Sequence, residues 1–388
     1  MEFSIPDATR LTTRPRRIQY LEGLRGVAAI QVVLLHFVTG FLPFAIEHAP
    51  APFPVLWDGH TAVYVFFLIS GLVLTPSFAR GGPWPRQVAK RLIRLGVPIA
   101  AAAVVALLLI AVLPDAHRDA ARLTGSSWLA MDSTAAPTPI HLLREITLDS
   151  LLLGYREYTL FAPFADRLPL LENALNAPSW SLHLELYGSL LVLALVKLRA
   201  RAPKAHTAAV LICAFAFGTH PMFLFVLGHL CAPGLAPKPR LGLAFLTFGL
   251  AASATKNWAW LETARIAIAG LAPVAAPNLF QFQSQLAAVA LFAGVLLNPS
   301  AQRLLTRCRA LGRLSFSIYL LHFPILFTLA CAGFIPLAAI LPQPAAVAVT
   351  FAAFMTITFL AAAVFERLID RHAVKLSRRA DPAQPSPT

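Results

Sequence analysis

Long apolar stretches recur along almost the whole 388-residue chain. Several of them approach the roughly 20 residues that an α-helix needs to cross a bilayer. The pattern predicts an all-α, polytopic integral membrane bundle of about ten transmembrane helices. The ten stretches are 24–43, 62–79, 95–113, 179–198, 206–219, 221–235, 241–254, 283–297, 314–332 and 345–364. Their boundaries stay open at 206–235, where His220-Pro221 interrupts the apolar run, and at 255–282.

Composition supports the membrane class. Hydrophobic residues make up 57% of the chain and charged residues only 13%, with a mean hydropathy of +0.68. A soluble protein of this size carries roughly a quarter charged residues. The sequence therefore excludes an ordinary soluble protein.

The basic residues are divided unevenly between the two sides that ten spans define. The net charge is +14, and 25 of the 32 Lys and Arg lie on or next to the side of the N-terminus. The other seven are Arg118, Arg122, Arg144, Arg156, Arg167, Lys256 and Arg265. This asymmetry follows the positive-inside rule and predicts cytoplasmic N- and C-termini. The basic excess is thus explained by topology, with some attraction to anionic lipid, and nucleic-acid binding is not expected.

Polar segments divide the chain into a few regions. They are a cytoplasmic N-terminal segment at 1–17, a transmembrane domain at 18–370 with an extracytoplasmic loop at 114–178, and a cytoplasmic, partly disordered tail at 371–388. The loop is long for a plain connector, which favours a binding loop or lid over a spacer. It contains an amphipathic stretch at 141–149, and the proline-rich end at 381–388 is expected to be disordered. The cysteines and histidines show no metal-ligand spacing, so no metal site is predicted.

Arg25 and His36 form the most informative pair of polar positions. His36 follows Arg25 by eleven positions in an almost wholly apolar segment, so both lie on one stripe of the first helix, about 16 Å apart along its axis. Ionisable groups within a span usually face the bundle interior or a wet cavity and mark a functional site.

Further polar positions enter three later spans. Ser70 precedes a glycine that allows close helix packing, and packing is the favoured explanation there. Arg91 and Arg94 share a helix face, where they either anchor the topology or bind an anion such as a phosphate. Trp180 fits an interfacial aromatic belt. Glu185 lies about one turn inside its span, where a structural ion pair is the alternative to a functional role.

A polar stripe also enters the ninth span. Ser315, Tyr319 and His322 lie on one face at the spacing i, i+4, i+7. A lone buried histidine is usually only hydrogen-bonded, so a structural role for His322 stays open beside a functional one.

Together these motifs resemble the membrane acyltransferase-3 family over residues from Tyr20 to about Glu366. They are Leu24-Arg25-Gly26 followed by His36, Phe66-Phe67-Leu68-Ile69-Ser70-Gly71, Arg91-x-x-Arg94, Trp180-Ser181-Leu182-x-x-Glu185, and Leu311-Gly312-Arg313 leading to Tyr319-Leu320-x-His322. The chain departs from the family pattern in three ways. Glu22 replaces the usual aspartate, and Leu186 follows Glu185 where a second acidic residue is common. No hydrolase-like domain is appended, so the chain resembles the stand-alone members of the family.

The resemblance implies an O-acyltransferase of the inner (plasma) membrane that uses acyl-CoA, often acetyl-CoA, as a cytoplasmic co-substrate rather than a resident cofactor. The acceptor would be a hydroxyl of a saccharide, glycolipid or other small molecule at the outer side. His36, Glu185 and Arg25 are the candidate catalytic residues, with His36 as general base because an imidazole exchanges protons near neutral pH. Glu185 would orient the imidazole or bind sugar hydroxyls. The candidate binding residues are Arg25, Arg91 and Arg94 for the phosphates of coenzyme A, and Ser70, Trp180, Tyr319 and His322 for lining the cavity.

A different class of function also fits part of the pattern. Intramembrane His and Glu residues and a basic mouth suit an exporter of a lipid-linked saccharide or small solute. Carriers, however, often show two halves of matching hydropathy, and this chain does not. A non-catalytic scaffold explains the charged stripe poorly. Consumption of acyl-CoA separates the enzyme from the carrier. The acceptor, the acyl length, the oligomeric state and the choice between direct transfer and an acyl-enzyme intermediate on His36 stay open, with direct transfer favoured.

Overall fold

The computed structural model describes residues 14–131, 138–255, 257–271 and 278–379, and the regular structure in these ranges is helical throughout. Seven helices in this part of the chain are long and apolar enough to cross a membrane. They are α1 (Arg14–Phe41), α3 (Gly59–Arg80), α4 (Trp84–Val112), α7 (Trp180–Arg201), α12 (Leu279–Leu297), α14 (Arg309–Ile325) continued by η7 (Leu326–Ala330) and α15 (Cys331–Ile340), and α16 (Gln343–Phe365) continued by η8 (Glu366–Asp370) and α17 (Arg371–Arg379).

Three of the ten predicted spans form shorter helices. They are α8 (Pro203–Phe217), α9 (Met222–Leu230) and α10 (Pro239–Ala254), with 15, 9 and 16 residues. The all-α, multi-pass membrane class is confirmed. The count of ten spans and the sides of the two termini stay predictions.

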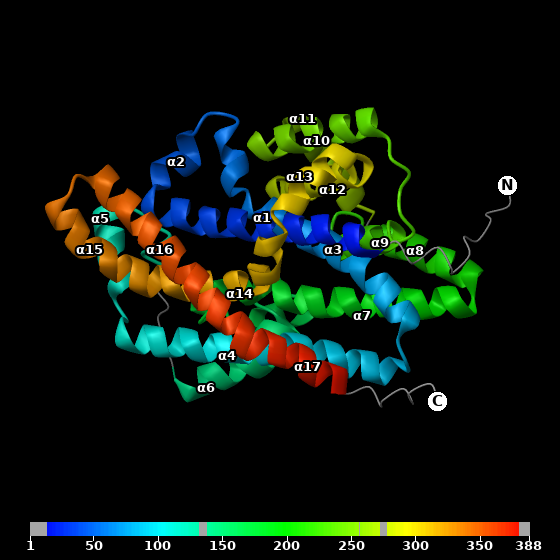
Figure 1. The fold of residues 1–388 in the computed structure, drawn as a ribbon, viewed down its shortest axis with the longest axis horizontal. Helices are drawn as coiled ribbons and strands as arrows, with labels where there is room; N and C mark the ends of the chain where they lie inside the picture. The colour runs from blue at the N-terminus through cyan, green and yellow to red at the C-terminus, as the bar shows by residue number, and fades with distance from the viewer. Residues whose placement is uncertain (1–13, 132–137, 256, 272–277, 380–388) are drawn as a thin grey trace.

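The long helices are arranged around a contact between α1 and α14. In Figure 1, α1, α4 and α7 run nearly parallel along the longest axis, and α16 crosses them diagonally. Glycines allow α1 and α14 to approach closely, because an added Cβ at Gly312 would lie 2.1 Å from the carbonyl oxygen of Glu22. Gly71 likewise lies against the backbone of Phe225 in α9, which confirms the predicted close helix approach.

The segment between α4 and α7 contains short helices. They are α5 (Ala116–Thr124), α6 (Pro139–Arg144), the π-helix η3 (Glu145–Leu153), and the 3-10 turns η4 (Ala162–Arg167), η5 (Leu171–Asn173) and η6 (Ala177–Ser179). The amphipathic stretch at 141–149 lies within α6 and η3, and η3 packs against α4 and α7. It ends at Gly154, whose φ of 76° favours glycine and whose missing side chain leaves room for the His183 ring.

The remaining helices are α2 (Pro43–His48), η2 (Phe53–Trp57), α11 (Ala259–Ala269) and α13 (Pro299–Arg307). Residues 371–379 of the predicted tail form α17, which packs along α4. The predicted disordered end at 381–388 lies outside the described residues.

Candidate active site

Two cavities between the helices contain most of the residues that the sequence singled out. The larger, about 820 Å³, is lined by His36, Trp128, Tyr158 and Trp180 among others, and we call it the histidine cavity. The smaller, about 180 Å³, is lined by Arg25, Ser70, Arg91, Arg94, Glu185 and Ser315 among others, and we call it the arginine cavity. Val63 and Tyr319 line both, so the two cavities meet at these side chains.

The predicted stripe on α1 is confirmed by this arrangement. Arg25 lines the arginine cavity and His36 lines the histidine cavity, and each side chain is partly buried. The stripe therefore connects the two cavities, about 16 Å apart along one helix.

His36 is held by a second histidine. Its Nδ1 lies 2.9 Å from Nε2 of His322, and Nδ1 of His322 lies 3.0 Å from the carbonyl oxygen of Ile318. A carbonyl only accepts, so Nδ1 of a neutral His322 carries the hydrogen and its Nε2 accepts from Nδ1–H of His36. This network leaves Nε2 of His36 as the unprotonated, basic nitrogen.

Aromatic rings fix the orientation of the His36 imidazole. Trp128 stacks on it at 5.5 Å between centroids and 19° between planes, and Phe323 contacts it edge-on at 5.5 Å. Trp128 comes from the loop between α4 and α7, so this loop contributes directly to the wall beside the histidine. The interpretation of the loop as part of a binding site is supported by this contact.

Glu185 lies in the arginine cavity and pairs with residues of two other helices. Its Oε1 accepts from Nη2 of Arg91 at 2.7 Å and from Oγ of Ser70 at 2.9 Å. The residue that contacts the His36 imidazole is His322, and not Glu185 as one of the predicted roles of Glu185 requires. The side chains of Arg91 and Glu185 are 13% and 15% exposed, so this ion pair is largely buried within the bundle.

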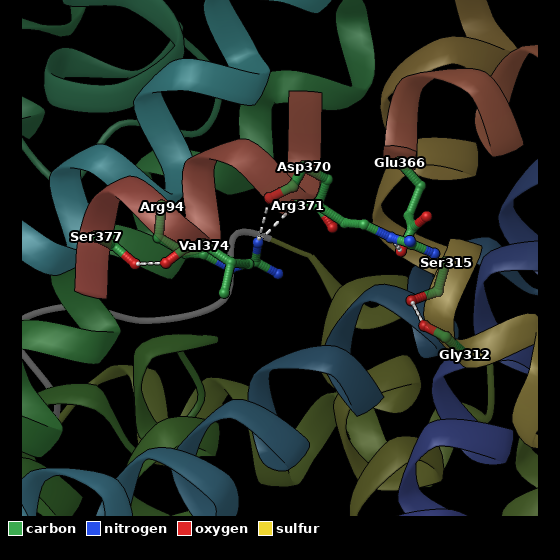
Figure 2. Close-up of polar contacts among 8 residues, drawn as sticks. All are labelled: Arg94, Gly312, Ser315, Glu366, Asp370, Arg371, Val374 and Ser377. Atoms are coloured by element: carbon green, nitrogen blue, oxygen red, sulfur yellow. Dashed lines mark hydrogen bonds and ion pairs between the residues drawn. The ribbon is translucent and has the colours of Figure 1, made fainter. Parts of the chain in front are cut away.

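Arg94 reaches the same cavity from the next turn of α4, which confirms that it shares a face with Arg91. Its Nη1 lies 2.6 Å from Oδ1 of Asp370 (Figure 2). Asp370 ends η8 at the junction of α16 and α17. Arg25 interacts electrostatically with Arg94, Glu185, Asp370 and Glu22, so three arginines and three carboxylates form one charged cluster.

Tyr319 stands where the cavities meet. Its hydroxyl donates to the carbonyl oxygen of Pro178 at 2.7 Å and lies 2.8 Å from Oγ of Ser181. Trp180 lines the histidine cavity, where its ring packs on Tyr158 at 4.3 Å between centroids. Trp180 thus lies among the aromatic residues of this cavity and not in the lining of the arginine cavity.

A buried acidic network supports the start of α7 behind Trp180. Oε2 of Glu145 accepts from the hydroxyl of Tyr155 at 2.6 Å, and Oε1 accepts from Oγ of Ser179 at 3.2 Å. Burial raises the pKa of the Glu145 carboxyl to about 7, although the hydrogen bonds from Tyr155 and Ser179 partly oppose this shift. The carboxyl is 4% exposed and lies outside the seven long helices.

Sequence reasoning missed two members of these clusters and one contact. It gave no role to Trp128 or Asp370, and it did not pair His322 with His36. In the part of the chain that the structure describes, no group of three or more His, Cys, Asp or Glu residues could hold a metal ion.

Comparison with known proteins gives one match. A family model described as an acyltransferase domain, that of the acyltransferase-3 family, matches residues 18–365. No curated protein and no solved structure matches significantly.

Proposed function

The chain belongs to the acyltransferase-3 family, and from this premise we propose that it transfers an acyl group from acyl-CoA to a hydroxyl acceptor across the junction of its two cavities. The family implies an acyltransferase, and the apolar helices imply a multi-pass membrane protein. The proposal adds the donor, the acceptor type, the roles of the residues and a direction from the cytoplasmic to the outer side.

The observation that carries the proposal is the hydrogen bond between His36, at the wall of the larger cavity, and the buried His322. Nε2 of His36 takes the proton of the acceptor hydroxyl as its oxygen attacks the thioester carbonyl. When the tetrahedral intermediate collapses, the carbon–sulfur bond breaks and the same proton passes to the departing thiolate. The products are an ester and free CoA, and His36 returns to its starting state.

His322 is expected to act through His36. After His36 has taken the proton, both of its ring nitrogens are donors, and Nδ1–H still donates to Nε2 of His322. A general base that keeps its partner in both protonation states needs no rearrangement during the step. Such positioned acid–base catalysis contributes roughly 10²–10⁴-fold to a rate.

The arginine cavity suits the phosphates of the donor. Guanidinium groups match phosphate oxygens, and Nε of Arg91 is buried without a hydrogen-bond partner in the described structure. With the phosphates at the arginines, the flexible pantetheine arm would extend past Tyr319 and present the thioester to His36. The small acetyl group is the expected acyl group.

The histidine cavity suits a saccharide or glycoconjugate acceptor. Trp128, Trp180 and Tyr158 give it aromatic walls, and Glu172 adds a polar group. Aromatic faces pack against the apolar faces of sugar rings, while polar groups bind their hydroxyls.

Thiol release from acetyl-CoA tests the function directly. The measurement uses the full chain in nanodiscs, with His36→Ala beside the wild type, and then adds candidate saccharides. We expect slow release by the wild type that an acceptor accelerates, and no release by the variant. His48→Ala is the matched control, because His48 is an exposed histidine of α2. Equal release by wild type and His36→Ala would remove the proposed base, and no release with any acyl-CoA would favour a carrier.

A further inference from the structure

Arg94 of the arginine cavity is bound by an anion from the chain itself. Oδ1 of Asp370 lies 2.6 Å from its Nη1, and the backbone carbonyl oxygen of Asp370 lies 3.3 Å from the same nitrogen. Figure 2 shows Asp370 meeting Arg94 from the segment that joins α16 to α17. An Asp carboxylate and a phosphate offer an arginine the same kind of charged acceptor oxygen.

We propose that Asp370 is the resident anion of the donor site, and that a phosphate of acyl-CoA replaces its carboxylate on Arg94. This inference rests on the proposed function, since it needs the donor phosphates to bind in the arginine cavity. It assigns Asp370 to substrate binding, as a competitor that the donor must displace.

The two ion pairs of this cavity differ in a way that supports the exchange. The side chains of Arg91 and Glu185 are 13% and 15% exposed, and their ion pair joins the two long helices α4 and α7. The hydroxyl of Ser70 also donates to the Glu185 carboxylate. In the other pair the Arg94 side chain is 30% exposed while Asp370 is 9% exposed. The Arg94 side chain is therefore more accessible to solvent than that of Arg91.

Asp370, the partner of Arg94, belongs to the π-helix η8, a single wide turn between α16 and α17. Such π-helical turns are rare and frequently occur at functional sites. Arg371, which follows Asp370, pairs with Glu366 at the start of the turn at 2.9 Å (Figure 2). Asp370 is thus held by a local turn of the chain's last described helices, which can adjust without separating α4 from α7.

The charges around the arginine cavity favour such an exchange of Asp370 for a phosphate. An arginine left without a partner in a partly buried site is unfavourable, so Asp370 stabilises the empty site. Of the charged residues that line the cavity in the described structure, Arg25, Arg91 and Arg94 are basic and Glu185 is acidic, so the wall of the cavity itself favours a polyanion. When the acyl group has left, Asp370 can compete for Arg94 again, and this competition favours the release of CoA.

Binding of CoA and of adenosine 3′,5′-bisphosphate by the full chain in nanodiscs tests the inference by calorimetry. If Asp370 competes with the donor, Asp370→Asn lowers the Kd of both ligands, by on the order of tenfold. Glu366→Gln is the matched control, because Glu366 is a buried carboxylate of the same turn that pairs with Arg371. It should leave both Kd values unchanged. In an Arg94→Gln background, Asp370→Asn should have no further effect.

Opposite or absent effects overturn the inference. Weaker binding by Asp370→Asn would show that Asp370 positions Arg94 for the donor, and unchanged binding would show that no exchange occurs. In both cases the wild type still binds CoA and releases thiol, so the proposed function stands. Failure of the wild type to bind CoA would overturn the inference and the proposed function together.

Hydrogen exchange gives a second test that needs no variant. Release of Asp370 frees η8 and α17, so the amides of residues 366–379 in the wild type should exchange faster when adenosine 3′,5′-bisphosphate is bound. Slower or unchanged exchange would contradict the displacement of Asp370. This test remains decisive if Asp370→Asn does not fold.

Discussion

At the scale of single residues, the pairing of two histidines changes how the site is understood. His36 alone is one ionisable residue on an apolar helix. His322 fixes which of its nitrogens is basic, because the carbonyl oxygen of Ile318 determines the tautomer of His322. The proposed chemistry therefore depends on a hydrogen-bonded chain of three groups.

His322→Ala tests this dependence. We expect kcat to fall by roughly 10–100-fold, as for residues that orient another functional group, with little change in the KM for acyl-CoA. The measurement is the initial rate of thiol release with a fixed acceptor. Ser317→Ala is the control on the same helix, because the buried Ser317 hydroxyl has no hydrogen-bond partner in the described structure. An undiminished kcat in His322→Ala would show that His36 needs no orienting partner.

Glu145 gives a prediction about pH. Its carboxyl has a pKa of about 7 in the folded protein, against 4.5 as its ordinary value. Between these values the folded state binds a proton that the unfolded chain has lost, so stability falls as pH rises through this window. The effect is worth about 1.4 kcal/mol per pH unit and should lower Tm by roughly 5 °C between about pH 5 and about pH 7.

Thermal unfolding in detergent at a series of pH values checks this prediction. Glu145→Gln should remove this part of the pH dependence and raise Tm at pH values above about 7, where the wild type must bury a charge. Glu172→Gln, which changes an exposed carboxylate of the same loop, should keep the wild-type profile. A pH profile of Glu145→Gln identical to that of the wild type would show that Glu145 does not control it.

At the scale of elements, the contact between α1 and α14 brings the histidines together. Gly26 and Gly312 lie at this contact, and an added Cβ at Gly26 would lie 2.5 Å from Cβ of Leu311. His36 follows Gly26 by ten residues, and His322 follows Gly312 by ten residues. Two helices that touch at their glycines therefore meet again, about 15 Å further along, at their histidines.

Gly312→Ala tests this relation. The new Cβ would collide with the backbone of Glu22, so α1 and α14 must separate. We expect a loss of roughly 1–3 kcal/mol of stability and a fall in activity, since the imidazoles also separate. Gly333→Ala on α15 is the control, because an added Cβ there meets nothing within 4 Å and alanine favours a helix. Equal Tm and activity of the two variants would contradict a role for the close approach.

The sequence predicted which residues share a helix face better than it predicted which residues contact each other between helices. Hydrophobic spacing was sufficient to place Arg25 and His36 on one stripe and Arg91 and Arg94 on one face, because both relations lie within a single helix. The His36–His322 bond joins residues 286 apart and depends on which helices touch. The equal glycine–histidine spacing in α1 and α14 was visible and could have indicated it. Asp370 gave no such signal, since nothing in its own segment indicates that η8 packs against α4.

At the scale of the whole molecule, the proposed reaction is divided between the two cavities. The arginine cavity lies near the start of α1 and α4, and the loop between α4 and α7 contributes Trp128 and Tyr158 to the histidine cavity. The excess of basic residues at the first end predicts that this end is cytoplasmic. The proposed direction of acyl transfer follows from this predicted orientation, because acyl-CoA is made and kept in the cytoplasm.

Cysteine accessibility in intact cells tests that orientation. In a variant without Cys213, Cys231, Cys308 and Cys331, single cysteines replace Trp84, an exposed residue at the start of α4, and Phe164, an exposed residue of the loop. A membrane-impermeant maleimide added outside should label Phe164→Cys and should label Trp84→Cys only after the membrane is permeabilised. Thiol release by each variant serves as the control for folding. The reverse labelling would place the arginine cavity outside, where acyl-CoA does not reach it, and would contradict the proposed direction of transfer.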